Sequence, residues 1–328
     1  MTSQEHPILI GDIGGTNARF ALTAHGESGY SNGINLKCAD YESADDAIAN
    51  YLAQIGASSP DVICLAVAAP VIEQTADFTN NHWHIVADEL ANRFEAHQVR
   101  LINDFEAIAH SLPLLDDADL MLIGERKFEL PNDDFTFGVI GPGTGLGQAG
   151  LIRRGGQVFP IPGEASHAGF APETQQQIEI LQSLRTRFER VSEERLVSGA
   201  GIENIYWAVH QDDPARHSKK NSAEIFAAAI DGSDEKAVCA VDQFFEILGQ
   251  IAGDLALSLN ATDGIFIAGG IIKRYPELLA RSCFRKGFES KGRYKSMMEK
   301  IPTQLILHAD PGLLGASHYA RELALKQN

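Results

Sequence analysis

The chain has 328 residues, enough for about two domains of ordinary size. It is acidic, with 27 lysines and arginines against 44 aspartates and glutamates and a formal net charge of −17. This balance argues against nucleic acid and anionic membranes as partners, because both attract basic surfaces. Any bound phosphate must therefore be held by local groups, since distant surface charges are screened beyond about 8 Å at physiological salt.

The four cysteines lie far apart in the sequence, so the chain has no CxxC pair and no clustered set of zinc ligands. Residues 1–6 are polar and the apolar run after them is short, which predicts no signal peptide. No stretch approaches the ~20 apolar residues of a membrane-spanning helix. We expect a reduced, soluble, cytoplasmic protein.

The first hundred residues alternate between short strands and helices. The predicted order is strand 7–10, strand 18–23, strand 33–37, helix 43–55, strand 62–68, helix 87–97 and strand 99–103. Strands that alternate with helices predict a mostly parallel sheet with both faces covered. The leading pair of strands predicts an antiparallel hairpin at the edge of that sheet.

A similar order restarts at residue 135, so the chain carries a faint internal repeat. Its predicted elements are strand 135–140, the glycine turn "GPGTGLG" at 141–147, strand 148–154, helices over 174–260, and strands 264–268 and 304–309. Each half therefore starts with a strand, a glycine turn and a second strand.

The domain boundary is expected near residues 112–118, with a last helix over 312–327 that packs back on the first half. The predicted domains are a small α/β domain of residues 1–113 with 308–328, and a large α/β domain of residues 114–307.

The two glycine turns are candidate phosphate sites. "GDIGGTN" spans residues 11–17 and "GPGTGLG" spans 141–147. Glycine adopts positive φ freely and lets the backbone approach a ligand, and successive N–H groups can form an anion-binding nest. A glycine hairpin without a ligand is the alternative. Two such turns at equivalent places in the two halves favour the phosphate interpretation.

Other nucleotide motifs are excluded. "GLGQAG" at residues 145–150 matches GxGxxG, but it leads into a predicted strand, whereas the dinucleotide fingerprint requires a helix there. The chain contains no GK[ST] sequence, and the HRD and DFG triplets of protein kinases are missing.

Polar residues and glycines follow several predicted strands, where ligands of parallel sheets bind. These residues are Asp12, Asn103, Asp104, Gly143 and Gly269, the last of them in "FIAGGI" (266–271). In "LINDFEA" (101–107), Asp104 is a candidate to accept a proton from a substrate hydroxyl, with Asn103 bonding a neighbouring hydroxyl. A helix N-cap is the alternative for this pair.

Three further polar residues are ambiguous from residue type alone. Glu164 and His167 lie three apart in "PIPGEASHAGF" (160–170), which is predicted to be a loop. Glu194 lies in "SEERLVSGAG" (192–201), where Ser192 is a candidate N-cap and Glu194 is a candidate first-turn acid.

Taken in order, these stretches resemble bacterial-type glucokinases of the non-repressor branch, over essentially the whole chain. The resemblance rests on "GDIGGTNARFAL", "FTNNHW" (78–83), "LINDFEA", "GPGTGLG", "PGEASHAGF", "ERLVSGAG", "FIAGGI" and "DPGLLGA" (310–316). It implies an α/β fold of two actin-like ATPase (ribonuclease H-like) domains around a cleft. The repressor-related branch typically carries a cysteine-rich zinc motif, which this sequence lacks.

The resemblance also implies roles for individual residues. Asp104 matches the catalytic base, and Asp12 matches the acid that organises Mg²⁺ through water. The implied sugar-binding residues are Asn103, Asp104, Gly145, Glu164, His167 and Glu194. The implied nucleotide-binding residues are Asp12, Gly14, Gly15, Thr16, Asn17, Gly143, Thr144, Gly269 and Gly270. Where family members have Gly-Gly before the histidine, this chain has Ala165-Ser166, which leaves sugar selectivity open.

The implied activity is phosphorylation of the 6-hydroxyl of D-glucose by Mg-ATP, as a step of glycolysis, in a cytoplasmic homodimer. Two alternatives stay open. A non-catalytic actin-like nucleotide switch or sugar sensor would keep the glycine turns without needing Asp104. A kinase for another hexose, such as mannose or N-acetylglucosamine, would keep every motif.

Overall fold

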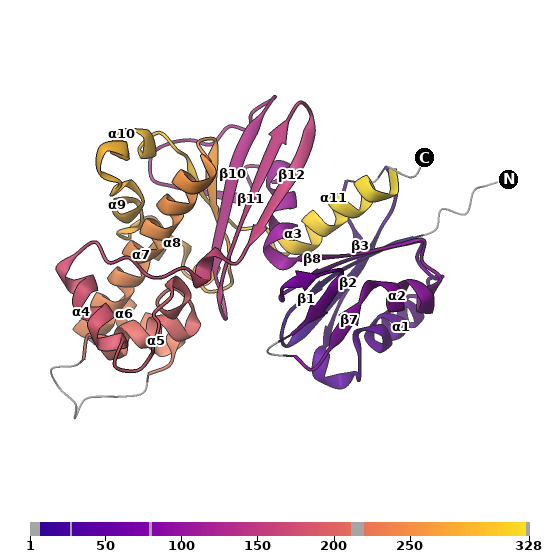
Figure 1. The fold of residues 1–328 in the computed structure, drawn as a ribbon, viewed down its shortest axis with the longest axis horizontal. Coiled ribbons are helices and arrows are strands. Elements are labelled where there is room, and N and C mark those ends of the chain that lie inside the picture. The colour runs from indigo at the N-terminus through magenta and orange to yellow at the C-terminus, as the bar shows by residue number, and fades with distance from the viewer. Residues whose placement is uncertain (1–6, 27, 79–80, 211–219, 326–328) are drawn as a thin grey trace. The chain divides into compact units, whose positions relative to one another are not determined.

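The computed structural model describes residues 7–26, 28–78, 81–210 and 220–325, which belong to two compact units (Figure 1). Unit 1 comprises Met1–Leu115 with His308–Asn328, and unit 2 comprises Asp116–Leu307. Each unit is built on one main sheet. Within the described residues, no helix has the length and apolar character needed to cross a membrane.

The sheet of unit 1 is mixed. Its spatial order is β3 (Ser31–Lys37), β2 (Asn17–Thr23), β1 (Ile8–Ile13), β4 (Val62–Val67) and β8 (Gln98–Asn103). β1, β4 and β8 are parallel, whereas β2 is antiparallel to both of its neighbours. The predicted parallel sheet with an antiparallel hairpin at its edge is therefore confirmed.

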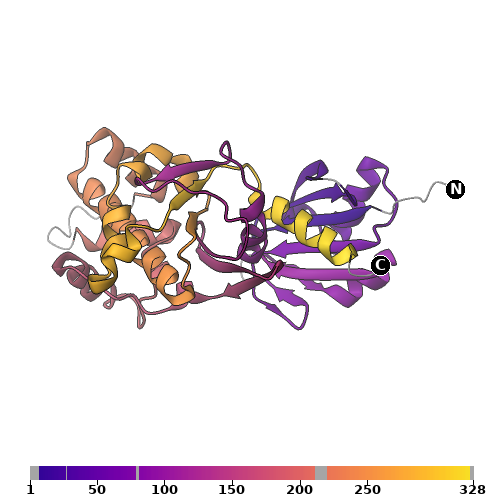
Figure 2. The ribbon, with the colours of Figure 1, turned by 90° about the horizontal axis from the view of Figure 1, so that it is seen from above.

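Helices cover both faces of this sheet. Successive residues of a strand point to opposite sides, so neighbouring residues of β1 pack against different helices. Leu9 packs toward α1 (Ala44–Ile55) and α2 (Ala87–Phe94). Ile8 and Ile10 pack instead toward α3 (Asp104–Ser111) and α11 (Pro311–Leu325), and Figure 2 shows α11 lying along the strands. The prediction that the last helix packs back on the first half is confirmed.

The sheet of unit 2 repeats the strand order of unit 1 and adds one strand. Its order is β12 (Gln157–Gly163), β11 (Leu146–Arg154), β10 (Phe135–Pro142), β13 (Gly264–Ile267), β14 (Thr303–Ile306) and β9 (Leu120–Ile123). In both sheets an antiparallel meander of three strands is followed by two parallel strands. The glycine turns join β1 to β2 and β10 to β11, so they occupy equivalent places.

The other elements of unit 2 are mostly helical. They are α4 (Gln175–Leu184), α5 (Gly199–Ala208), α6 (Ser222–Asp231), α7 (Glu235–Leu259), α8 (Pro276–Ala280), α9 (Phe284–Glu289) and α10 (Lys295–Met298), with short 3-10 turns η3 (Ala165–His167), η4 (Glu193–Arg195) and η6 (Ile272–Arg274). α7 is buried along most of its length and forms the centre of the core.

Three predictions about local structure are wrong or incomplete. Residues 157–163 form strand β12, although the sequence predicts a loop from residue 160. A small sheet of β5 (Val71–Ile72), β6 (Thr75–Asp77) and β7 (His84–Val86) was not predicted, nor was β9. Ser192 precedes η4, but its side chain makes no capping hydrogen bond.

Candidate functional site

The parallel strands of unit 1 bring its predicted site residues to one edge of the sheet. β1, β4 and β8 end together, since Ile13 is in register with Val67 and Val67 with Asn103. Neighbouring strands lie about 4.8 Å apart, which puts the ends of β1 and β8 about 10 Å from each other. Asp12 and Asn103 therefore lie at the same edge, as the sequence predicts.

The first glycine turn is closed and anchored by backbone hydrogen bonds. The Gly14 N–H donates to the Asn17 carbonyl at 2.9 Å, and the Cys38 N–H donates to the Thr16 carbonyl at 2.9 Å. Asn81, from the "FTNNHW" stretch, donates its side-chain amide to the Gly14 carbonyl at 3.4 Å, whereas Thr79 and Asn80 lie outside the described residues. Gly14 and Gly15 do not adopt positive φ, so that part of the argument for this turn is wrong.

Asp12 lies beside a shared cation. It is the cross-strand partner of Arg19, whose Nη1 is 3.5 Å from the Asp12 Oδ2. The Nε of the same guanidinium is 3.4 Å from the Oδ1 of Asp310, which directly precedes α11. Burial raises the pKa of the Asp12 carboxyl, the Arg19 charge lowers it, and the Asp310 carboxylate raises it.

This arrangement fits a magnesium ion that takes few ligands from the protein. Within the described residues, no group of three or more histidine, cysteine, aspartate or glutamate side chains could hold a metal ion by itself. Mg²⁺ usually keeps several waters and is bound by one or two carboxylates together with substrate phosphates. Asp12 and Asp310 share one guanidinium and keep a net negative charge, so Asp12 can hold a hydrated Mg²⁺ near the first glycine turn.

Asn103 and Asp104 form the start of α3. The Phe105 N–H is shared between the Asn103 Oδ1 and the Asp104 Oδ1, at 2.9 Å from each. Asn103 is thus the N-cap, so the capping alternative describes its local structure. Burial raises the pKa of Glu106 in the same turn, and a hydrogen bond from the Asn103 backbone opposes that shift. The cap fixes both side chains at the end of β8.

The second glycine turn, residues 143–145, is held by the segment that contains Glu194. The Gly143 N–H donates to the Gly145 carbonyl at 2.7 Å, and the Gly199 N–H donates to the Gly143 carbonyl at 2.9 Å. The Glu194 Oε2 accepts a hydrogen bond from the Leu146 N–H at 3.0 Å. Two predicted sugar-binding residues, Gly145 and Glu194, are therefore in contact.

Two strand-like pairings bring Glu164 and His167 toward the same turn. Gly163 is in register with Gln148 of β11, so Glu164 lies near the start of that strand. The Glu193 N–H donates to the Ala168 carbonyl at 3.1 Å. The His167 Nε2 lies 4.0 Å from the Glu164 Oε2, and both side chains are more than half exposed. The predicted sugar-binding residues of unit 2 thus gather around the second glycine turn.

Gly269 lies against the end of β10. Its φ is +98°, and a β-carbon there would overlap the Pro142 carbonyl. The Ala268 N–H donates to the Ile140 carbonyl at 2.8 Å, which continues the pairing of β13 with β10 beyond the strand. Gly269 therefore needs the conformational freedom of glycine, which was not predicted for this position. Gly143 and Gly145, by contrast, do not adopt positive φ.

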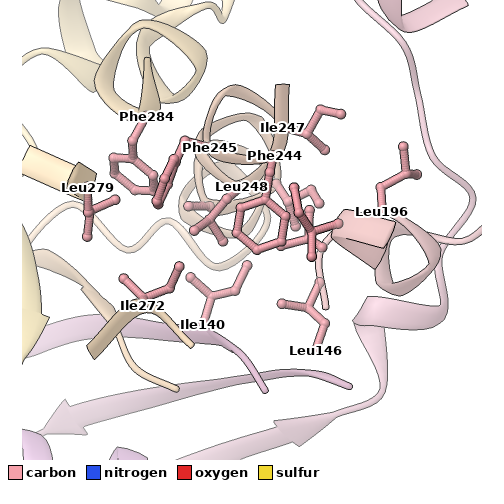
Figure 3. Close-up of a cluster of buried hydrophobic side chains, with 14 of the residues drawn as sticks. Ile140, Leu146, Leu196, Phe244, Phe245, Ile247, Leu248, Ile272, Leu279 and Phe284 are labelled. Atoms are coloured by element: carbon pink, nitrogen blue, oxygen red, sulfur yellow. The ribbon is translucent and has the colours of Figure 1, made fainter. Parts of the chain in front are cut away.

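One hydrophobic cluster anchors three of these segments. Leu146 follows the second glycine turn, Leu196 follows Glu194, and Ile272 follows the Gly269–Gly270 pair. All three side chains are buried in the same hydrophobic cluster as Phe244 and Leu248 of α7 (Figure 3). Because the anchors are close-packed, the polar groups beside them are held in place.

Three charged residues around these groups escaped prediction. Arg19 and Asp310 flank Asp12. The alternating pattern of β2 was the available signal for Arg19, and the "DPG" sequence at the start of the last helix was the signal for Asp310. Glu193 accepts a hydrogen bond from the Gln148 Nε2 at 3.2 Å. Burial raises the pKa of Glu193 to about 7, with Asp254 raising it and Lys291 lowering it. No local pattern distinguishes Glu193 from a first-turn acid.

Comparisons with known proteins match nearly the whole chain. The family model described as Glucokinase matches residues 9–323. A glucokinase from Nitrobacter hamburgensis is 40% identical over 315 residues, which cover 96% of this chain and 97% of that protein.

Solved structures agree with this match. The crystal structure of a glucokinase from an Antarctic psychrotroph has a TM-score of 0.86 at 33% identity, with 97% of this chain and 100% of that chain covered. A ROK-family glucokinase from Streptomyces griseus, solved in complex with glucose and AMPPNP, has a TM-score of 0.63. It covers 96% of this chain and 99% of its own at 20% identity, which shows a likeness of fold alone.

Proposed function

The chain belongs to the glucokinase family, and from that premise we propose that it transfers the γ-phosphoryl group of ATP to the 6-hydroxyl of D-glucose. It is a hexose kinase, and its mixed α/β units have the actin-like ATPase fold. The observation that carries the choice of sugar is the gathering of Gly145, Glu164, His167 and Glu194 around one turn in unit 2, in a chain whose relatives are glucokinases.

Asp104 is the proposed general base. A sugar hydroxyl is a weak nucleophile with a very high pKa, so a carboxylate within hydrogen-bond reach must take its proton as the bond to phosphorus forms. Asp104 directly follows β8 as the first residue of α3, and its Oδ1 accepts a hydrogen bond from the Phe105 N–H. In this proposal the neighbouring Asn103 bonds a second hydroxyl and orients the sugar.

The proposed sugar shell selects by hydrogen bonding. Glu164, His167 and Glu194 together offer carboxylate acceptors and an imidazole, which suit the hydroxyls of a monosaccharide. A site built to hydrogen-bond hydroxyls discriminates against analogues that lack them by ~10⁴ in good cases. The contact between Glu194 and the Leu146 N–H supports this role, because it aims a fixed carboxylate beside Gly145.

The nucleotide is proposed to lie along the glycine turns, with Gly14, Gly15, Thr16 and Asn17 in one and Gly143 and Thr144 in the other, and with adenosine at Gly269 and Gly270. Phosphoryl transfer is mostly positioning and charge stabilisation. Mg²⁺, held by Asp12 through water, would offset the negative charge of the phosphates. The fold has a precedent for both ligands, since the Streptomyces griseus glucokinase was solved with glucose and AMPPNP.

A coupled assay of the purified chain with Mg-ATP and a panel of sugars tests the proposal. We expect the highest kcat/KM with glucose, lower values with mannose and N-acetylglucosamine, and no turnover without sugar. ATP turnover that does not depend on any sugar would favour a nucleotide switch. A preference for mannose or N-acetylglucosamine would keep the chemistry and correct the substrate.

We also propose a homodimer, which light scattering tests directly.

A further inference from the structure

One guanidinium in unit 1 is divided between two carboxylates. The Arg19 Nη1 is 3.5 Å from the Asp12 Oδ2, and its Nε is 3.4 Å from the Asp310 Oδ1. Asp12 is on β1, Arg19 on the neighbouring strand β2, and Asp310 directly before α11, so the first hairpin meets a segment from the far end of the sequence here. Because Asp310 engages the Nε side of the group, Arg19 does not neutralise Asp12 completely.

The start of α11 closes another side of Asp12. A β-carbon placed on Gly312 would lie 3.3 Å from the Asp12 Cγ and 3.3 Å from its Oδ2. This separation is tighter than an ordinary van der Waals contact, so only a glycine lets the helix approach without moving the carboxylate. Asp12 is therefore confined by Arg19 and by the first turn of α11.

Stability does not account for the arrangement. The side chains of Arg19, Asp12 and Asp310 are 44%, 23% and 31% exposed. The Arg19 guanidinium that both pairs share is well exposed to solvent and both separations are long for charge-assisted hydrogen bonds, so the two pairs contribute little to the free energy of unfolding. A role in orientation fits the geometry better than a role in folding.

We propose that Arg19 and Asp310 are positioning residues that hold the Asp12 carboxylate for the magnesium ion of the bound nucleotide. This inference rests on the proposed function, in which Asp12 organises that ion. Residues that orient a ligand of a metal typically change metal affinity by about 10- to 100-fold when they are removed. Arg19 and Asp310 act through Asp12 and need not touch the substrate.

The test is the affinity of the full chain for AMPPNP, measured by calorimetry once with Mg²⁺ and once with EDTA. The dissociation constant in EDTA divided by that in Mg²⁺ reports how much the metal strengthens AMPPNP binding. We expect Arg19→Met to lower this ratio about tenfold and Asp310→Asn to lower it severalfold, with the affinity in EDTA unchanged. Arg19→Lys keeps the positive charge but loses the planar guanidinium that can bridge two carboxylates. Its ratio should therefore lie between those of Arg19→Met and wild type.

Arg93→Met is the matched control. Arg93 also bridges two aspartates of unit 1, with its Nη1 3.6 Å from the Asp45 Oδ2 and its Nη2 2.7 Å from the Asp46 Oδ1, on helices α1 and α2. It is expected to leave the Mg²⁺ dependence and glucose affinity at wild-type values. Urea unfolding of all variants identifies any that lose the fold, and in that case Arg19→Lys and Asp310→Asn carry the test.

Asp12→Asn distinguishes a failure of the positioning role of Arg19 and Asp310 from a failure of the proposed role of Asp12. If it abolishes the Mg²⁺ dependence while Arg19→Met and Asp310→Asn do not change it, the positioning role is wrong and the proposed role of Asp12 survives. If Asp12→Asn itself has no effect, both are wrong. If Arg19→Met weakens AMPPNP equally in EDTA, Arg19 binds the phosphates directly and the positioning role is again wrong.

Discussion

Glu194 leaves no room for a side chain on Gly145, 49 positions earlier in the sequence. A β-carbon on Gly145 would overlap the Glu194 Oε2, the same oxygen that accepts the Leu146 N–H at 3.0 Å. The glycine thus lets the carboxylate approach the backbone closely, and its φ is not positive. This contact joins a predicted sugar ligand to the predicted phosphate turn.

Gly145→Ala should therefore weaken sugar binding without unfolding unit 2. The new methyl group would push the Glu194 carboxylate away and leave the Leu146 N–H without its acceptor, which costs about 1–3 kcal/mol. We expect the dissociation constant for glucose to rise about tenfold or more, as measured by calorimetry without nucleotide.

Gly143→Ala is the control within the same turn. A β-carbon at Gly143 would meet no atom within 4 Å, so glucose affinity without nucleotide should stay near the wild-type value.

Glu194→Gln should keep the bond from the Leu146 N–H through its amide oxygen and still weaken glucose binding, because the charge is lost. Equal glucose affinities in wild type and Gly145→Ala would remove Glu194 from the sugar shell.

Asp104→Asn should separate catalysis from binding. The amide keeps the shape of the side chain and an oxygen for the Phe105 N–H, but it cannot take a proton. We expect kcat to fall about 10²- to 10⁴-fold, with the dissociation constant for glucose changed severalfold at most. The measurement is steady-state kinetics beside calorimetry.

Glu106→Gln is the matched control for that variant, since Glu106 lies in the same first turn of α3. It removes a charge near Asp104 without removing the proposed base, so kcat should stay within a factor of about two. A near-normal kcat in Asp104→Asn would show that another group takes the proton.

Much of the fold was predictable because its strands and helices carry strong local patterns. β4 is a continuous apolar run and every one of its residues is buried, as expected for a strand covered on both faces. "GLGQAG" was correctly excluded as a dinucleotide fingerprint, since Leu146–Arg154 is a strand. β5 to β7 were missed because strands of two or three residues are too short to show a period of two.

β12 was missed for a different reason. Pro160 and Pro162 indicate a loop, but proline is tolerated in an edge strand, and β12 is the edge of its sheet. For the candidate site, the positions of its residues at strand ends and glycine turns were predictable. Its internal contacts were not, because the bond from the Leu146 N–H to Glu194 depends on tertiary packing and leaves no local pattern.

The two glycines of "FIAGGI" should respond differently to alanine. Gly269 has a φ of +98°, and a β-carbon there would overlap the Pro142 carbonyl. Strain from such a backbone costs of order 1–3 kcal/mol, and the overlap adds to it. We expect Gly269→Ala to lower the free energy of unfolding by about 2–4 kcal/mol in urea.

Gly270→Ala is the neighbouring control, because a β-carbon at Gly270 would meet no atom within 4 Å and its φ is not in the positive range. Its free energy of unfolding should stay within about 0.5 kcal/mol of the wild-type value. Similar losses in both variants would mean that the loop tolerates neither side chain and that φ does not decide the outcome.

Glu193 should make the stability of unit 2 depend on pH. Burial raises its pKa from 4.5 to about 7, and Gln148, Asp254 and Lys291 are the polar groups that act on it. Lys291 is itself nearly buried and pairs with Glu173 at 3.1 Å and with Asp254 at 2.8 Å. The carboxyl of Glu193 thus faces an amide, a second acid and a lysine whose charge is already shared.

Proton binding by Glu193 decides whether the free energy of unfolding rises or falls with pH. Between about pH 4.5 and pH 7 the folded chain keeps the proton of Glu193 and the unfolded chain has lost it, so this group makes the free energy of unfolding fall as pH rises. The loss is complete above pH 7 and absent below pH 4.5, and its size is of order 1 kcal/mol per pKa unit. Urea unfolding at intervals from pH 5 to pH 8 measures it.

Glu193→Gln should flatten that pH dependence, because an amide keeps a partner for Gln148 and does not titrate. Relative to wild type, the variant should gain stability as the pH is raised from 5 to 8. Glu189→Gln, on the exposed part of the same segment, should follow the wild-type curve. Parallel curves for wild type and Glu193→Gln would mean that Glu193 is ionised in the folded chain throughout this range, with Lys291 and solvent compensating for its burial.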